Sequence, residues 1–427
     1  MSRRLRLGVA GVATAVVLTG WIIRRASGGL GTATPPFVAG WLPRIDPAGA
    51  LGAAAALLAS VLLGPRLLDR RLPAACFSAA SYLLALSLGL AVNLARDGTA
   101  GWWRMFAVGG TGLREGANEY LAGLPALSYG PRFYLDRFAE LVPSLPVHVA
   151  GHPPGPLLLV DALGITTPQG LAALCIAAGA LCAPLAHRLA WTLHDERMGR
   201  VAGVLCALSP ALVLFGTSSY DAVFAAMGAL AACCLVARAA AWRMVGAAAL
   251  AAGTLMSWSL LGVGAWAALV GWRRTGVRAA LVTAAGCGAA VLALNGALAL
   301  ATGYDAAGAL AATSRVYDNS LASIRPYGFW VLGSPVAWGV MTGPPILAAA
   351  LSGLAALRPA AIGLGIVVAV AAVGGFSKAE TERIWLFLVP LACVAAAPHV
   401  DVRRLRLVLA ALAIQIIAVQ LLFETVW

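Results

Sequence analysis

The sequence predicts an all-α fold, a polytopic bundle of transmembrane helices. Of the 427 residues, 61% are hydrophobic and only 11% are charged. The apolar residues form continuous blocks that are long enough to cross a hydrocarbon core of roughly 30 Å. Because these blocks lack the alternation of barrel strands, helices are the expected spanning elements. We expect one integral membrane domain that comprises residues 1–427.

The apolar stretches predict about 11 to 13 spans of this kind. The first follows a basic N-terminal segment and runs directly into Arg24 and Arg25, without a small-residue cleavage site. A signal anchor is therefore favoured over a cleaved signal peptide. The stretches lie at about 8–23, 48–64, 74–95, 167–190, 201–219, 221–240, 243–256, 259–272, 279–301, 333–356, 360–375, 384–398 and 407–425.

The net charge of +13 reflects the orientation of the chain in the membrane and not nucleic-acid binding, because the arginines cluster in alternate turns between the spans. Short basic turns face the cytoplasm. We therefore expect a multi-pass protein of the plasma membrane with a cytoplasmic N-terminus and an extracytoplasmic C-terminus. A bias toward Ala, Gly and Arg, with Lys378 as the single lysine, is typical of GC-rich bacterial genomes such as those of actinobacteria. The basic turns lie within 3–6, 66–71, 188–200, 238–243, 273–278, 358 and 403–406.

In this orientation, three polar segments lie on the outer face, at 96–160, 302–332 and 376–383. The first is the longest interval without a clean apolar run. Weak amphipathicity, broken by prolines, predicts short interfacial helices within it. It also contains four carboxylates and several arginines, which points to a functional site. The carboxylates are Glu115, Glu119, Asp136 and Glu140.

One pattern in the first outer loop resembles a known family. Asn118-Glu119-Tyr120 precede His152-Pro153-Pro154, which lead into an apolar segment. This arrangement resembles the GT-C membrane glycosyltransferases, and within them the branch of protein O-mannosyltransferases and lipid A aminoarabinose transferases. The resemblance covers roughly 96–300. Asn118 stands where these proteins carry the first of two acidic residues, and two spans separate the first helix from the large loop, so the chain looks like a divergent branch.

The resemblance implies inverting transfer of a sugar from a polyprenyl-phosphate donor to a glycan or glycolipid acceptor at the outer membrane face, without a further cofactor. Such chemistry needs a carboxylate as general base and cations on the leaving phosphate. It also needs an apolar groove for the lipid. Glu119 and Asp136 are the candidates for the base, and the departure at Asn118 leaves the choice between them open. Alternatively, either carboxylate pairs with a neighbouring arginine at the surface.

Seven further residues are candidates for substrate binding. Lys378, Glu382 and Arg383 form a late polar segment that suits a phosphate, although its charges can also pair locally. Arg325 and Tyr327 suit a sugar, and the aromatic residues around them equally suit a membrane-interface belt. Tyr120 adjoins Glu119, and His152 is expected to fix its loop or to bind phosphate.

A metal site is not expected. His148 and His152 are four residues apart, but Gly151 and Pro153 oppose the helix that a paired site needs. Asp221 begins a span from the outer face and is either functional or a helix cap.

Two other classes of function compete with the glycosyltransferase. In a transporter or lipid flippase, ionisable groups are expected inside the spans, whereas the charge of this chain is concentrated in loops. A non-catalytic subunit of an envelope-synthesis complex is the third reading, because Asn118 replaces an acidic residue.

Overall fold

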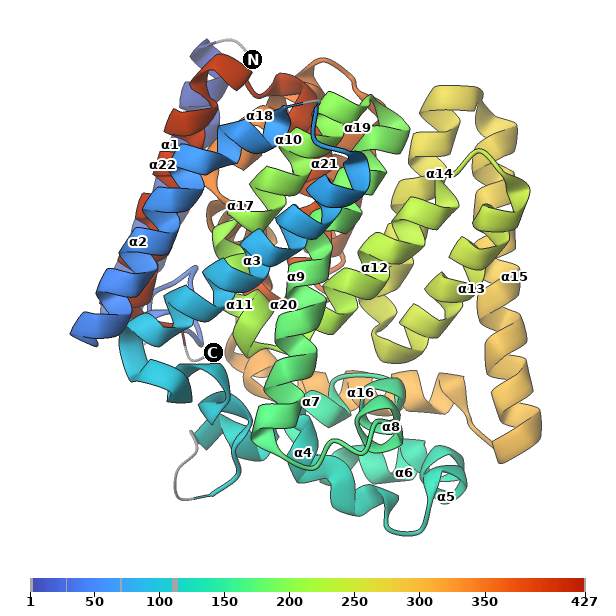
Figure 1. Ribbon diagram of the computed structural model, residues 1–427. Coiled ribbons are helices and arrows are strands. Elements are labelled where there is room, and N and C mark those ends of the chain that lie inside the picture. Colours follow the sequence, from blue (N-terminus) through green and yellow to red (C-terminus); the bar gives the residue numbers. More distant parts are fainter. Residues whose placement is uncertain (1–2, 28, 70, 110–113, 426–427) are drawn as a thin grey trace.

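The computed structural model describes residues 3–27, 29–69, 71–109 and 114–425 and confirms an all-α membrane-type bundle (Figure 1). Arg70, which belongs to one of the basic turns, lies outside the described residues. Two short strands, β1 (Gly40–Trp41) and β2 (Phe423–Glu424), pair in antiparallel fashion and join the early and late parts of the chain.

Among the described residues, six helices are long and apolar enough to cross a membrane. Each predicted apolar stretch overlaps a helix, and these six provide the continuous spans. Their length and hydrophobicity indicate a membrane protein. The six helices are α1 (Arg3–Ser27), α2 (Pro47–Leu63), α3 (Ala74–Asp97), α9 (Pro168–Leu193), α15 (Val277–Thr302) and α22 (Leu405–Leu422).

Two bent pairs of helices are apolar enough to form one broken span each, which would bring the number to eight within the described ranges. The pair α10 (Glu196–Ala207) and α11 (Pro210–Ser218) bends by 57°. The pair α17 (Tyr327–Thr342) and α18 (Pro344–Ala355) bends by 114°. At the second bend, Gly343 has a φ of 115°, and Pro344 has no N–H to continue the ladder. The stretches 201–219 and 333–356 are therefore not straight helices.

Shorter helices account for the remaining predicted stretches. They are α12 (Asp221–Leu235), α13 (Ala240–Met256), α14 (Leu261–Thr275), α19 (Pro359–Val373) and α21 (Val389–Ala396). Every residue of α21 is buried, whereas α15 buries only Cys287 along its length. The interior of the bundle therefore lies around α21, and α15 presents most of its side chains outward.

Close helix contacts in the centre depend on small residues. A Cβ added to Gly179 of α9 would lie 2.2 Å from the carbonyl oxygen of Gly216 on α11. Only glycine permits this approach of the two backbones. α9 thereby fixes the position of α11 and of the turn at 219–221 that follows it.

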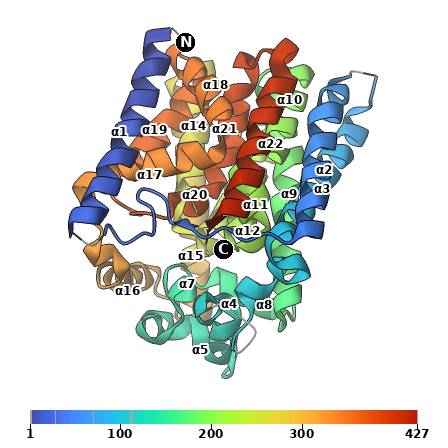
Figure 2. The ribbon, with the colours of Figure 1, turned by 90° about the vertical axis from the view of Figure 1, so that its left-hand side faces the viewer.

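The first polar loop and α16 (Ala306–Asp318) lie at one end of the bundle, which we call the loop end (Figures 1 and 2). The predicted interfacial helices of 96–160 are there, together with this helix from the second polar segment. The N-terminus and the turn between α14 and α15 lie at the opposite end. The short helices of the first loop are α4 (Tyr120–Gly123), α5 (Pro131–Asp136), α6 (Phe138–Leu141), α7 (Val147–Ala150) and α8 (Gly155–Ala162).

Residues 29–46, which we call the strap, connect α1 to α2 and pass toward the C-terminal part of the chain (Figure 2). Arg96 of α3 fastens this segment by donating to the carbonyl oxygens of Leu42, Gln420 and Phe423. A second fastening is the ion pair between Arg44 and Asp97, 2.7 Å long. The strap is therefore tied to α3 and to the end of α22.

Candidate functional site

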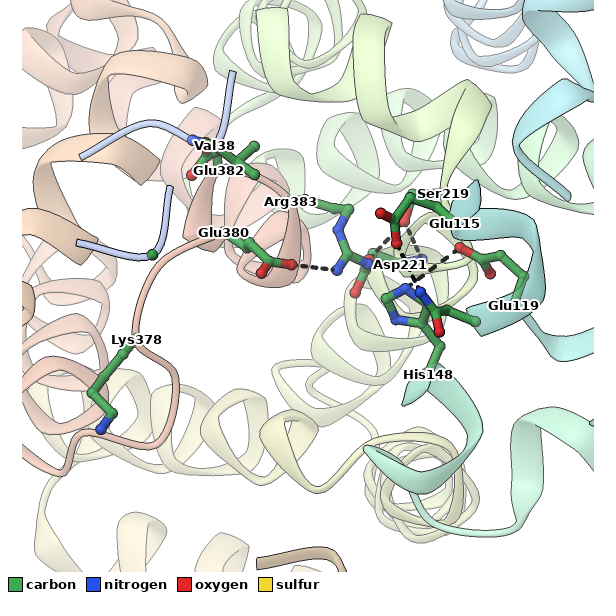
Figure 3. A network of polar contacts seen from close by, with 12 residues as sticks. Val38, Glu115, Glu119, His148, Ser219, Asp221, Lys378, Glu380, Glu382 and Arg383 are labelled. Atoms are coloured by element: carbon green, nitrogen blue, oxygen red, sulfur yellow. Dashed lines mark hydrogen bonds and ion pairs between the residues drawn. The ribbon is translucent and has the colours of Figure 1, made fainter. Parts of the chain in front are cut away.

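The centre of the candidate site is Arg383 on the short helix α20 (Thr381–Ile384), and its side chain is buried. Its Nη1 donates to Oδ2 of Asp221 at 2.6 Å, and its Nη2 donates to Oε2 of Glu380 at 3.1 Å (Figure 3). Burial lowers the pKa of Arg383, but Asp221, Glu380 and Glu119 together raise it above its ordinary value. Arg383 is therefore charged and is surrounded by carboxylates.

The backbone that leads into α20 is strained. Ala379 and Glu380 have φ values of 70° and 58°, in the left-handed region that residues with a Cβ seldom adopt. Such residues persist where the surrounding structure overdetermines them, and they gather at functional sites. The strain positions Glu380 against Arg383.

Asp221, at the start of α12, is held in position to contact Arg383 by a neighbouring hydroxyl group. Its carboxylate is buried and accepts a hydrogen bond of 2.6 Å from the Ser219 hydroxyl. The N-cap position of α12 belongs to Tyr220, which makes no side-chain capping bond. The structure therefore does not support a capping role for Asp221.

Arg325 extends the same network from the second polar segment. It donates to Oε1 of Glu380 at 2.6 Å and to the carbonyl oxygens of Lys378 and Gly31 at 2.8 and 3.2 Å. Burial raises the pKa of Glu380, but Arg383 and Arg325 outweigh it, so the pKa lies below its ordinary value. We call Asp221, Arg383, Glu380 and Arg325 the ion network. Its charges alternate from one side chain to the next.

Glu119 enters the site from the loop end, between η4 (Arg114–Asn118) and α4. The residue is 2% exposed, and its Oε1 lies 3.7 Å from Nε2 of His148 on α7. Burial, and then the charge of Arg383, lower the pKa of His148 to about 3. The imidazole is therefore neutral at physiological pH. Figure 3 shows Glu119 and His148 on one side of Arg383 and Glu380 on the other.

Glu382 is next to Arg383 in sequence, but it faces the strap. Its Oε1 accepts a hydrogen bond of 2.7 Å from the backbone N–H of Val38. Its Oε2 is buried and has no hydrogen-bond partner among the described residues. Burial raises the pKa of Glu382 to about 7. Through its hydrogen bond to Val38, this carboxyl group joins the strap to α20.

The structure brings some of the residues expected at the site together and separates others. Glu119 and Arg383 are both buried, and Glu119 is close enough to raise the pKa of Arg383. We call Glu119, His148 and the ion network together the buried cluster (Figure 3). Lys378 points away from Arg383, and its ammonium donates to the carbonyl oxygen of Ala322 at 2.8 Å (Figure 3). Tyr327 is half-exposed and donates to the carbonyl oxygen of Val373 at 2.6 Å.

Asp136 lies elsewhere, at the junction of α5 and α15. It is half-exposed, and its Oδ2 is 3.5 Å from Nε of Arg137. Its other oxygen lies against Gly303, where an added Cβ would meet it at 2.3 Å. Within the described part of the chain, no recorded hydrogen bond or ion pair joins Asp136 to the ion network.

The two aromatic residues of the resemblance motif pack beside the cluster. The ring of Tyr120 lies 4.3 Å from that of Tyr220, and the ring of His152 lies 4.8 Å from that of Phe224. Burial lowers the pKa of His152 to about 4. The charge of Asp221 acts against this shift, and the charge of Arg383 adds to it. Both motif residues therefore seat the first polar loop on the start of α12.

Two residues of the cluster, Glu380 and His148, were not assigned to the site from the sequence, and Asp221 was expected to be either functional or a helix cap. Asp221 follows two serines and a tyrosine at the end of an apolar stretch, and this polar interruption is the signal that marks it. Glu380 lies in the polar segment 376–383 and His148 in the first polar loop, but neither sequence context identifies its partner. Among the described residues, no three His, Cys, Asp or Glu side chains form a group that could hold a metal ion.

Comparison with known proteins assigns no family. No protein-family model matches the chain, and no match was found among curated proteins or among solved structures.

Proposed function

We propose that the protein is a membrane glycosyltransferase that moves a sugar from a polyprenyl-phosphate donor to a glycan or lipid acceptor at the outer face of the plasma membrane, with inversion. The observation that carries the proposal is that Glu119 and Arg383, from distant parts of the chain, lie in one buried cluster. A carboxylate base and a cation for the leaving phosphate are the two groups that this reaction needs. In this proposal, the loop end faces outward, and the basic turns face the cytoplasm.

Glu119 acts as the general base. As the acceptor hydroxyl attacks the anomeric carbon, its proton passes to the Glu119 carboxylate. The new bond between oxygen and carbon forms while the bond from that carbon to the phosphate oxygen breaks, and the phosphate leaves with the electron pair. Because His148 is neutral, it does not offset the charge of the carboxylate. His148 instead supports the orientation of Glu119 from 3.7 Å away.

Arg383 stabilises the charge that develops on the phosphate. In the structure its Nη1 is occupied by Asp221, so the donor phosphate replaces this carboxylate on binding. A guanidinium binds carboxylates and phosphates with the same geometry, which makes such an exchange of partners possible. Glu380 continues to hold Nη2 and keeps the side chain in place.

The test is transfer by the purified protein in lipid nanodiscs, with polyprenyl-phosphate donors that carry different radiolabelled sugars and with a lipid-linked glycan as acceptor. We expect transfer from one of these donors and its loss in Glu119→Gln. Equal transfer by wild type and Glu119→Gln would show that Glu119 is not the base. If no donor supports transfer, the proposed enzyme activity is refuted, and a non-catalytic subunit becomes the favoured function.

A transporter is the second candidate, and two observations favour it. The α17–α18 pair is broken by a 114° bend, and Thr381 of α20 donates to the carbonyl oxygen of Ser334 within α17 at 2.7 Å. Broken helices beside buried ions are typical of transporters. Proteoliposomes loaded with a fluorescent polyprenyl-phosphate lipid separate the two functions. A transporter moves the lipid between leaflets without an acceptor, whereas a transferase consumes donor only when the acceptor is present.

A further inference from the structure

A groove of about 300 Å³ lies between α1 and the strap, apart from the ion network. Its walls are mainly apolar, and one arginine stands among them. The lining residues are Val17, Leu18, Trp21, Arg24, Thr34 and Pro35.

The wall that the strap provides is built into the fold. A Cβ added to Gly20 would lie 2.7 Å from the carbonyl oxygen of Pro35, so only glycine lets the strap lie directly on α1. Thr34 and Phe37 exchange backbone hydrogen bonds of 2.7 and 3.2 Å, which close the strap into a turn at this point.

The groove opens toward the membrane. Leu18 and Trp21 are 54% and 48% exposed on a helix that is long and apolar enough to span a bilayer. Arg24 lies one turn further along, and the guanidinium of Arg25 lies 4.1 Å from the centre of the Trp21 ring. A tryptophan beside arginines is typical of the headgroup level. The groove thus has an apolar floor and a cationic rim, which complements a lipid with an anionic head.

The size of the groove suits one chain. A cavity of about 150 Å³ holds benzene, so 300 Å³ holds on the order of a dozen carbon atoms. That is part of a single hydrocarbon chain, whereas a phospholipid carries two. A polyprenyl phosphate has one chain and one phosphate.

The strap also connects the groove with the ion network. Val38 is three residues after Pro35, and a chain of this length spans at most roughly 10 Å. The N–H of Val38 binds Glu382, the neighbour of Arg383. A lipid that lies against Pro35 is therefore close to the wall of the candidate site.

We propose that this groove is the docking site for the isoprenoid chain of a polyprenyl-phosphate lipid, and that Arg24 pairs with its phosphate before the head group reaches Arg383. The identity of the lipid as the sugar donor rests on the function proposed above. The docking site itself is defined by α1 and the strap.

The experiment uses the full-length protein in phosphatidylcholine nanodiscs and a radiolabelled polyprenyl monophosphate with a photoreactive group in its isoprenoid chain. Crosslinked peptides are expected from α1 and the strap. Leu18→Trp fills the groove and should lower binding tenfold or more. Leu83→Trp, a matched change at an outward-facing position of α3 that is 60% exposed, should leave binding unchanged. Arg24→Gln should weaken binding by about ten- to a hundredfold, and Arg132→Gln on α5 should not.

Three results would overturn the docking site. One is a crosslink map without α1 and the strap, which decides the matter even if a variant fails to fold. The second is equal affinity of wild type and Leu18→Trp. The third is equal competition by phosphatidylglycerol, which would make the groove an ordinary lipid contact. Because the monophosphate carries no sugar, binding is measured independently of transfer. If the protein proved to have no transferase activity, the binding result would still stand. If transfer were normal but the groove variants bound the lipid as tightly as wild type, only the docking site would be refuted.

Discussion

Arg383 and Asp221 form a buried ion pair, with 2.6 Å between Nη1 and Oδ2 and exposures of 5% and 4%. The pair joins the strained segment before α20 to the start of α12. Removal of one partner from a buried pair leaves an uncompensated charge away from water. The two residues are therefore coupled in stability as well as in the proposed reaction.

The first prediction concerns this pair. Asp221→Asn should lower the free energy of unfolding by about 3–5 kcal/mol, toward the lower end because Glu380 still holds Arg383. Denaturant unfolding of the detergent-solubilised protein measures the change. Asp401→Asn removes the exposed partner of Arg404 and should cost less than about 1 kcal/mol. Equal losses in the two variants would contradict a special role for the buried pair.

The second prediction tests the base. Glu119→Gln should reduce the rate of transfer by about 10²–10⁴, because the amide cannot take up the acceptor's proton. Asp136→Asn changes a carboxylate in the same loop that lies outside the cluster, and it should retain near-normal turnover. The measurement is kcat for transfer in nanodiscs at saturating donor. A normal Glu119→Gln together with an inactive Asp136→Asn would reverse the assignment.

The third prediction tests phosphate binding. Arg383→Lys keeps the positive charge but loses the fork that binds two oxygens at once. Affinity for the polyprenyl-phosphate sugar should fall by about tenfold to a hundredfold, since charge-assisted bonds contribute roughly 1.5–3 kcal/mol. The same exchange at half-exposed Arg137 serves as the control. Titration of both variants with donor measures the difference, and unchanged affinity in Arg383→Lys would exclude a direct phosphate contact.

The fourth prediction concerns orientation. Ser128 is exposed at the loop end, and Cys76 is exposed at the start of α3. In a variant without the other cysteines, Ser128→Cys should react with an impermeant thiol reagent on intact cells. A separate variant that retains only Cys76 should react only after permeabilisation. The opposite pattern would invert the proposed topology.

The fifth prediction follows from Glu382. Burial raises its pKa from 4.5 to about 7, so the folded protein binds this proton more tightly than the unfolded chain. The stabilisation is complete below pH 4.5 and is lost as the pH rises through about 7. Its size is at most about 3–4 kcal/mol, since the pKa rises from 4.5 to about 7 and one pKa unit corresponds to about 1.4 kcal/mol. Glu382→Gln should flatten the dependence of the unfolding midpoint on pH, and a profile identical to that of wild type would contradict the prediction.

The helices could be predicted because continuous apolar blocks satisfy both the bilayer and the backbone. The bend after α17 could not be predicted in this way. Gly343, Pro344 and Pro345 lie inside a stretch without charged residues, and hydrophobicity alone treats it as one span. Its direction depends on the φ of Gly343, which composition does not determine.

The site was predictable where its residues stand in a local pattern. Glu119 precedes a tyrosine in a charged loop, and Arg383 ends a polar segment. Their partners come from other parts of the chain, and pairs such as Asp221 with Arg383 arise only from tertiary packing. Likewise, nothing in the sequence marks the N–H of Val38 as the partner of Glu382, since every non-proline residue carries this donor.

The pairing of β1 with β2 has a consequence for biogenesis. Residues 40–41 are synthesised early, but their partners at 423–424 are synthesised only after α22. During translation, the strap therefore waits for the last helix before Arg96 can fasten it to the carbonyls of Gln420 and Phe423. Val38 reaches Glu382 through the same segment, so the wall of the site is completed after synthesis of these strands. A nascent chain halted before α22 consequently lacks one span and the contacts that fasten the strap.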